Sequence, residues 1–181
     1  MKPGDIKYVD QNDDGVVNSN DQVMIGRSAA PFSYGLDLRF SYKSFTFYAL
    51  GYGRNGADAY MSGNYYWVDG DDKYSDFILN RWTPTTKATA TFPRLSSVSN
   101  SNNFQNSTYW LYENNYFDLQ RVQLSYELPA SVARRFFMKR LNCYVDANNL
   151  LLISKNRKVR ELNVGSEPQY RAFSVGIRTL F

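Results

Sequence analysis

The residues of this chain whose types and spacing favour chemistry lie near its start, in residues 10–21, which read DQNDDGVVNSND. Side-chain oxygens occupy the first, third, fifth, ninth and twelfth places of this loop, which are Asp10, Asn12, Asp14, Asn18 and Asp21. Gly15 at the sixth place permits a sharp turn, and Val16 at the seventh offers a main-chain carbonyl. Calcium takes about six to eight oxygen ligands, and this spacing wraps oxygens around one point.

The loop departs from the usual pattern at its last place. Asp21 stands there instead of the longer glutamate, as in dockerin-type loops, so the ion would be held more loosely or with an extra water. Asp13 adds charge without a ligand role, and no flanking helices of EF-hand length are visible. The alternative is an Asx-rich turn that only resembles a calcium loop. We predict a structural calcium site between strands.

The elements that position this loop are predicted to be long strands, of which residues 170–181, YRAFSVGIRTLF, form the clearest. Polar or small residues alternate there with an almost wholly apolar row, Phe173, Val175, Ile177 and Thr179. Strict alternation indicates a strand with one apolar and one polar face. Its length suits a strand that crosses a bilayer, which needs about 9–11 residues, whereas a soluble strand usually has about five or six.

The same alternation recurs in a predicted hairpin over residues 32–53, with a tight turn at Lys43 and Ser44, and in residues 109–128 and 141–155. Cys143 falls on an apolar row, where a lone cysteine acts as a small hydrophobe. We count about six membrane-length strands. Charged and amide side chains on the opposite row suit a water-filled lumen, namely Asp37, Arg39, Arg121, Gln123, Glu127, Asn142, Asp146 and Arg178.

Residues 54–107 lack this pattern and are rich in Gly, Asp, Tyr, Trp, Ser and Asn, with one or two helical turns predicted around residues 74–81. A long irregular segment is unusual in a compact domain but typical of the external loops of outer-membrane barrels. Its side chains can stack on a sugar or peptide, or they can pack the loop against itself. The candidates for substrate contact are Tyr65, Tyr66, Trp67, Trp82 and Arg94.

Composition agrees with alternating strands and excludes several function classes. Aromatic residues make up 17% of the 181 residues, yet the mean hydropathy is −0.51, because polar faces offset apolar ones. No apolar run is long enough for a transmembrane helix. The chain has one cysteine and no histidine, which excludes an internal disulfide and imidazole catalysis. A net charge of +4 is too small to indicate nucleic-acid binding, and no carboxylates are spaced as an acid–base pair, so we expect no enzyme.

Several segments taken in order resemble a known family. They are GDIKYVDQNDDGVVNSNDQVMIG followed by a proline, FSYGLDLRFSYKSFTFYALGYG, RWTP with a later FPR, YFDLQRVQLSYELP, LNCYVDANNLLLISK and a terminal phenylalanine. This series resembles the C-terminal barrel region of SusC/RagA-type TonB-linked outer-membrane proteins of Bacteroidota. Asp13 is a departure, since the family usually has glycine there.

The resemblance implies an all-β fold, an antiparallel transmembrane segment of a barrel of about 22 strands with an internal plug. It implies outer-membrane uptake of oligosaccharides or peptides with a SusD-like lipoprotein, energised through TonB. A plug, a TonB-interacting segment and a signal sequence are not recognisable in these residues and are expected outside them. About six strands are fewer than the roughly eight of the smallest membrane barrels, so we expect this segment not to close into a barrel alone.

A second hypothesis comes from another class of protein. The same strands could form a soluble, calcium-stabilised β-sandwich that binds glycans through the Tyr and Trp residues of its long loop. Burial against a second sheet would support the sandwich, for the side chains of Leu36, Leu38, Val122, Leu124, Val175 and Ile177. Exposure of the same side chains would support a face that meets lipid acyl chains.

Overall fold

A computed structural model describes residues 1–72, 74–98 and 102–181, and the chain divides into two compact units. The first contains Met1–Ser28 and Asp58–Tyr112, and the second contains Ala29–Ala57 and Glu113–Phe181. We describe each unit by itself.

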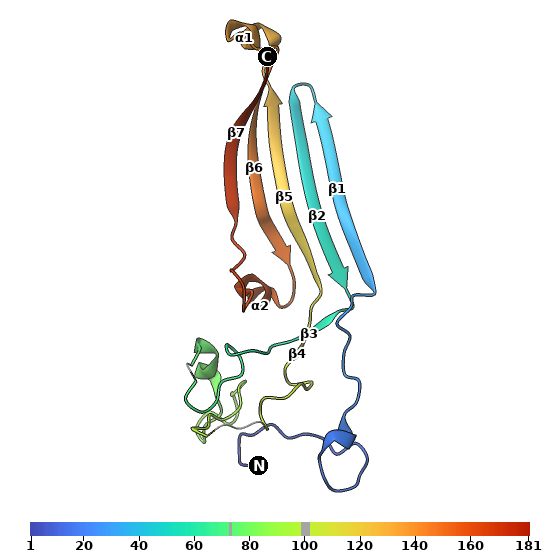
Figure 1. The fold of residues 1–181 in the computed structure, drawn as a ribbon, viewed down its shortest axis with the longest axis vertical. Helices are drawn as coiled ribbons and strands as arrows, with labels where there is room; N and C mark the ends of the chain where they lie inside the picture. The colour runs from blue at the N-terminus through green and yellow to red at the C-terminus, as the bar shows by residue number, and fades with distance from the viewer. Residues whose placement is uncertain (73, 99–101) are drawn as a thin grey trace. The chain divides into compact units, whose positions relative to one another are not determined.

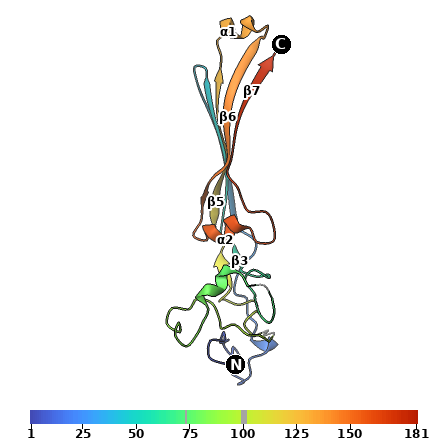
Figure 2. The ribbon, with the colours of Figure 1, turned by 90° about the vertical axis from the view of Figure 1, so that its left-hand side faces the viewer.

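The second unit is built on one antiparallel sheet of five strands in the order β1-β2-β5-β6-β7 (Figure 1). The strands are β1 (Phe32–Tyr42), β2 (Phe45–Asn55), β5 (Tyr116–Glu127), β6 (Arg140–Ile153) and β7 (Ala172–Leu180). They contain 11, 11, 12, 14 and 9 residues. Seen edge-on in Figure 2, the sheet is a single twisted layer.

Local sequence explains how these strands end. Lys43 and Ser44 alone connect β1 to β2, and Lys43 adopts a positive φ of 53°, as tight hairpin turns require. Pro129 follows β5 and precedes helix α1 (Ala130–Arg135), and helix α2 (Arg157–Leu162) lies in the connection from β6 to β7. The register shifts between Leu119 and Arg121 at a bulge. The predicted turn, hairpin and terminal strand are therefore present.

Two glycines of β2 let aromatic rings lie flat on the sheet. A Cβ atom at Gly51 would come within 2.5 Å of Cζ of Phe117, and the ring of Tyr34 covers Gly53. The rings of Tyr34 and Phe117 are themselves stacked, with centroids 6.1 Å apart. The absence of a side chain at Gly51 and at Gly53 thus gives the rings of Phe117 and Tyr34 room to pack.

The first unit is mostly irregular and contains the short 3-10 helices η1 (Ser19–Asp21) and η2 (Asp76–Asn80). The strands β3 (Asp58–Tyr60) and β4 (Leu111–Glu113) form a separate two-stranded sheet. The core of the first unit is largely aromatic: Trp110, Phe92 and Tyr66 are buried, together with the aliphatic Val68. The helical turns predicted around residues 74–81 are confirmed as η2. Lys73 and residues 99–101 of the predicted loop 54–107 lie outside the described residues.

Two predictions about the strands were wrong. The described residues contain five long strands, not about six. The predicted strand of residues 109–128 is divided, because Asn114 and Asn115 separate β4 from β5. Both asparagines have side-chain amide oxygens that accept bonds from outside the ladder, Asn114 from Arg160 and Asn115 from the main chain of Gly56. Alternation continues across them in the sequence, so the pattern alone does not reveal the break.

Candidate functional site

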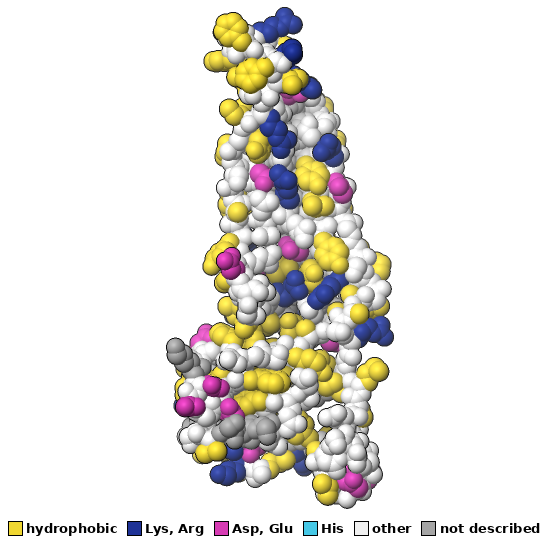
Figure 3. All heavy atoms as spheres, in the orientation of Figure 1, with side chains coloured by type: hydrophobic (Ala, Val, Ile, Leu, Met, Phe, Trp, Pro, Cys, Tyr) yellow, Lys and Arg dark blue, Asp and Glu magenta, His cyan; other side chains and the backbone are white. Residues whose placement is uncertain are grey.

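The five-stranded sheet has a polar face whose residues come from all five strands. The pairing of Leu50 with Asp37 and Arg121, and of Asn142 with Glu127 and Arg178, brings the predicted lumen residues onto this one face. Figure 3 shows acidic and basic side chains intermingled over the sheet. The prediction that these side chains share one face is confirmed by the register, namely for Asp37, Arg39, Arg121, Gln123, Glu127, Asn142, Asp146 and Arg178.

At the centre of the polar face lies an ion pair between neighbouring strands. Arg121 Nε donates to Asp146 Oδ1 at 2.7 Å, and the Asp146 side chain is largely buried. Asn148 donates to the other oxygen of Asp146 at 3.0 Å. Gln123 Oε1 accepts from Arg121 at 3.3 Å and from Arg178 at 3.4 Å, which links β5 to β7. The face therefore carries a connected hydrogen-bond network and not isolated charges.

The opposite face is apolar, and its side chains are exposed. Phe173, Val175 and Ile177 of β7 are 69%, 81% and 66% exposed. Apolar side chains on other strands of this face are also exposed, namely Leu38, Phe40, Phe47, Leu124 and Val145. No second sheet covers them among the residues that the structure describes. Of the six side chains that a β-sandwich would bury, Leu36 and Val122 are partly buried and the other four are exposed. This exposure is the outcome expected for a face that meets lipid.

None of the helices within the described residues has both the length and the hydropathy that a membrane-spanning helix requires.

Residues 10–21 fold into a tight loop held by main-chain to side-chain hydrogen bonds. The amide of Gly15 donates to Asp10 Oδ2 at 2.7 Å, and the amide of Val16 donates to Asp14 Oδ1 at 2.8 Å. Asp21 accepts from the amides of Gln11 at 2.8 Å and Asn18 at 2.7 Å. The three aspartates predicted as ligands, Asp10, Asp14 and Asp21, therefore turn their carboxylates back toward the loop.

The chemistry of this donor set fits a hard cation. Oδ1 of Asp10 is enclosed without a hydrogen-bond partner among the described residues. Hydrogen bonds from the amides of Asn18 and Gln11 lower the pKa of Asp21, so its carboxylate stays charged. Within the described chain no group of three or more His, Cys, Asp or Glu side chains is close enough to hold a metal. Amide and main-chain oxygens, from Asn12, Val16 and Asn18, would have to complete the ligand set.

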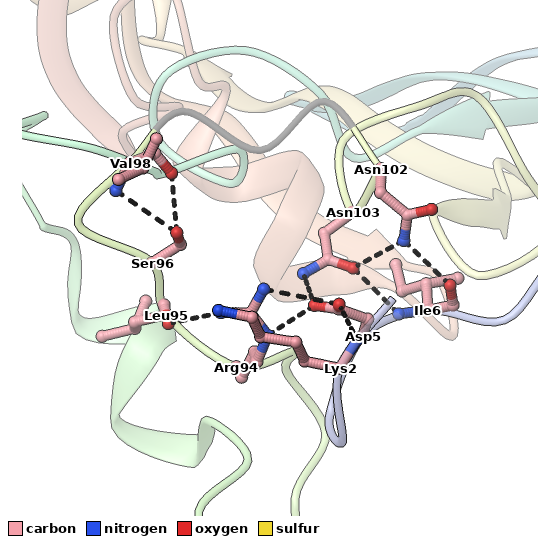
Figure 4. A network of polar contacts seen from close by, with 9 residues as sticks. All are labelled: Lys2, Asp5, Ile6, Arg94, Leu95, Ser96, Val98, Asn102 and Asn103. Atoms are coloured by element: carbon pink, nitrogen blue, oxygen red, sulfur yellow. Dashed lines mark hydrogen bonds and ion pairs between the residues drawn. The ribbon is translucent and has the colours of Figure 1, made fainter.

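A second polar cluster joins distant parts of the first unit (Figure 4). Arg94 Nε lies 2.7 Å from Oδ1 of Asp5, whose side chain is only 3% exposed. Asn103, which is fully buried, donates to Asp5 at 3.1 Å and accepts from the amide of Ile6 at 2.8 Å. Burial by itself raises the pKa of Asp5. Hydrogen bonds from the Lys2 amide, Arg94 and Asn103 outweigh this effect, so the pKa of Asp5 is below its ordinary value.

The five candidates for substrate contact take part in the packing of the first unit. Tyr66 is buried, and the ring of Trp67 lies 6.4 Å from that of Trp110. Tyr65 donates to Asp76 at 2.6 Å, and this hydrogen bond, with partial burial, raises the pKa of Tyr65 to about 12. Trp82 lies against Gly4, and Arg94 pairs with Asp5. These contacts favour the self-packing alternative, and a role in substrate contact stays a prediction.

Sequence reasoning missed one cationic cluster on the second unit. The guanidinium carbon of Arg160 lies 3.4 Å from the ring centroid of Tyr116, and that of Arg54 lies 5.2 Å from it. Arg160 also donates to Asn114 at 2.8 Å. Arg160 belongs to α2 and Arg54 to β2, so only the fold brings them together, and neither occurs in a recognisable motif.

Two comparisons with known proteins, one by sequence and one by structure, point to the same kind of protein. No family model matches the chain. The chain is 26% identical over 196 residues to TonB-dependent receptor P26 of Formosa agariphila, a match that covers 98% of the chain and 20% of that receptor. The chain therefore spans about a fifth of the length of this curated relative.

Solved structures show the same fold. A chain of the RagAB peptide importer in its open-open state matches with a TM-score of 0.68 and 24% identity, over 96% of this chain and 20% of that one. The closed-closed state gives 0.63 and 23%, over 92% and 20%. None of these proteins is described as an enzyme. The resemblance to SusC/RagA-type TonB-dependent proteins is thereby confirmed.

Proposed function

We propose that this chain, which resembles part of a SusC/RagA-type TonB-dependent receptor over nearly its whole length, forms a section of the barrel wall of an outer-membrane nutrient importer. The observation that supports this proposal most strongly is a single-layer sheet with one exposed apolar face and one polar face. Strands of 9 to 14 residues suit a tilted crossing of a bilayer, which needs about 9–11. In this arrangement the apolar face meets acyl chains and the polar face lines the lumen.

The ends of the sheet support an orientation. One end has the two-residue turn from β1 to β2 and the connection through α1, and the other leads into the long connection from β2 to β5. Outer-membrane barrels have short periplasmic turns and longer external loops. We therefore assign the α1 end to the periplasm and residues 54–107 to the external loop.

The proposal implies partners for both edges of the sheet. Within the described residues, β1 and β7 each pair on one side only, and an unpaired edge does not persist in a bilayer. Further strands of the same barrel, about 22 in all, would pair with them. A plug inside the lumen, a SusD-like lipoprotein and the TonB complex complete the proposed importer. RagAB is described as a peptide importer, and peptides or oligosaccharides are the proposed cargo.

Fractionation of cells that make the intact protein tests this proposal. We expect an antibody against residues 58–72 to detect the protein in the detergent extract of outer membranes, with an electrophoretic mobility that changes on boiling. Deletion of the gene should abolish uptake of labelled peptides or oligosaccharides, and loss of TonB should have the same effect. A monodisperse monomer recovered in aqueous buffer would disprove the proposal.

We also propose that residues 10–21 bind calcium as a structural ion through Asp10, Asn12, Asp14, the carbonyl of Val16, Asn18 and Asp21. The enclosed Oδ1 of Asp10 and the inward hydrogen bonds of Asp14 and Asp21 support this. We expect millimolar calcium to protect the loop from proteolysis in the intact protein, and a chelator to restore cleavage.

Two aspartates of the same loop form a matched pair for this test. Asp14→Ala should abolish the protection, because a charged ligand is lost. Asp13→Gly removes the same charge from a place without a ligand role, and it should leave the protection intact because glycine tolerates the positive φ of 59° there. Equal protection in both variants, or none in the parent protein, would mean that the loop is an Asx-rich turn only.

A further inference from the structure

The connection between β5 and β6, residues 128–139, has a composition that its role as a turn does not explain. It contains helix α1 followed by Phe136, Phe137 and Met138, and lies at the same end of the sheet as the chain's last residue (Figure 1). A two-residue turn suffices for the neighbouring hairpin. The extra residues therefore need a reason other than connecting two adjacent strands.

Two adjacent phenylalanines of this connection project into solvent. Phe136 is 59% exposed and Phe137 is 92% exposed. Phe137 also has a φ of 59°, the left-handed region that a bulky residue adopts only at a cost. The turn that ends α1 explains this conformation: the Phe137 amide donates to the Arg134 carbonyl at 3.1 Å and the Met138 amide to the Ala133 carbonyl at 3.1 Å, the two bonds of a Schellman cap, in which the residue after the C-cap is left-handed. Glycine is the usual residue at this place of such a cap, and here an exposed phenylalanine occupies it.

Basic side chains surround the two rings. Arg134, Arg135 and Lys139 are exposed, and residues 128–140 contain no Asp or Glu. The next basic residue, Arg140 at the start of β6, forms an ion pair with Glu127 at 3.1 Å. Figure 3 shows hydrophobic and basic side chains side by side over α1. Three cations beside two exposed aromatic rings form a surface that is complementary to a negatively charged, amphipathic ligand.

We infer that residues 134–139 form a docking site for an anionic phospholipid of the periplasm-facing leaflet. Phe136 and Phe137 enter the boundary between headgroups and acyl chains, while Arg134, Arg135 and Lys139 contact the phosphate. The inference rests on the proposed barrel function, which puts this end of the sheet at a membrane surface. It adds a lipid-headgroup preference that the barrel function does not require.

Lipid titration of the intact, detergent-purified protein tests the inference. Native mass spectrometry would measure the retention of phosphatidylglycerol and of phosphatidylcholine with the same acyl chains. We expect the parent protein to prefer phosphatidylglycerol, and Arg134→Ala/Arg135→Ala/Lys139→Ala to bind it at least roughly tenfold more weakly. Phe136→Ser/Phe137→Ser should weaken both lipids, since it removes the apolar contact. Inorganic phosphate should not compete, because it lacks acyl chains.

Two controls separate charge from folding and from general basicity. Arg134→Lys/Arg135→Lys keeps the charge and should keep the preference. Lys158→Ala/Arg171→Ala removes two exposed cations from the connection that contains α2, at the other end of the sheet, and should leave the preference unchanged. Equal binding of both phospholipids by the parent protein, or an equal loss in the Lys158/Arg171 control, would overturn the inference. A protein absent from outer membranes would contradict the barrel function instead, so the two failures are distinguishable.

Discussion

At the scale of single residues, the contact between Asp5 and Arg94 fixes the N-terminal segment to a distant part of the first unit. The two residues lie 89 positions apart, and Asn103 completes the contact from a third segment. A buried carboxylate needs both a counter-charge and hydrogen bonds, and here it has both. The cluster is therefore a point where one substitution should release several segments together.

We expect Arg94→Leu to destabilise this attachment by about 3 kcal/mol, because it leaves the Asp5 carboxylate buried without a counter-charge. Hydrogen exchange of residues 2–8 in the intact protein should become faster. Arg157→Leu is the matched control, since it breaks an exposed ion pair with Glu161, whose loss costs at most about 0.5 kcal/mol. Unchanged exchange in Arg94→Leu would show that packing alone holds the segment.

The same carboxylate predicts a dependence on pH. Because the pKa of Asp5 in the folded protein lies below its ordinary value of 3.8, its stabilising contribution is complete above that value. The contribution is lost as the pH falls below 3.8 through the folded pKa. Exchange of residues 2–8 should accelerate in that range, and Asp5→Asn should remove most of the acceleration. An equal acceleration in Asp5→Asn would assign the effect to another group.

At the scale of elements, neighbouring residues of strand β7 face the two different sides of the sheet. Val175 and Ser174 are adjacent and both exposed in this chain, but they lie on opposite faces. We expect Val175→Lys to destabilise the intact protein in a bilayer by about 2–4 kcal/mol, because it puts a charge among acyl chains. Ser174→Lys places the same charge on the polar face and should cost much less. Denaturant unfolding in lipid bilayers would measure both.

If the two lysine variants were equally stable in a bilayer, the assignment of faces would be wrong. The difference between them is informative because their positions along the strand, and so their depths, are nearly equal. Backbone pairing is also similar, since Ser174 faces Asp146 and Val175 faces Val145 in the same ladder. The environment of the side chain is then the main variable.

At the scale of the whole molecule, the five-stranded sheet has unpaired edges and an uncovered apolar face as far as the described residues go. Edges of this kind pair with other chains, and large apolar patches associate in water. We expect these 181 residues produced alone to aggregate in aqueous buffer, whereas the intact protein in detergent is monodisperse. Size-exclusion chromatography would compare them. A stable aqueous monomer of the chain alone would contradict the lipid-facing assignment.

The sequence by itself determined the alternation of the strands, the turn at Lys43 and Ser44, and the ligand-like spacing of residues 10–21. Each depends on neighbours a few positions apart, where side-chain period and turn chemistry act directly. It also determined which residues share a face, since a period of two assigns every second residue to one side. An ordered series of motifs in the sequence indicated the resemblance to a family.

Only the tertiary structure decided that the apolar row is exposed, that the strand of residues 109–128 divides at Asn114 and Asn115, and that Tyr66 and Trp67 pack within the first unit. It alone brought Asp5 to Arg94 and Arg160 to Tyr116. The physical reason is the same in each case. Burial and ion pairing depend on contacts between residues far apart in the chain, and neither periodicity nor composition records those contacts.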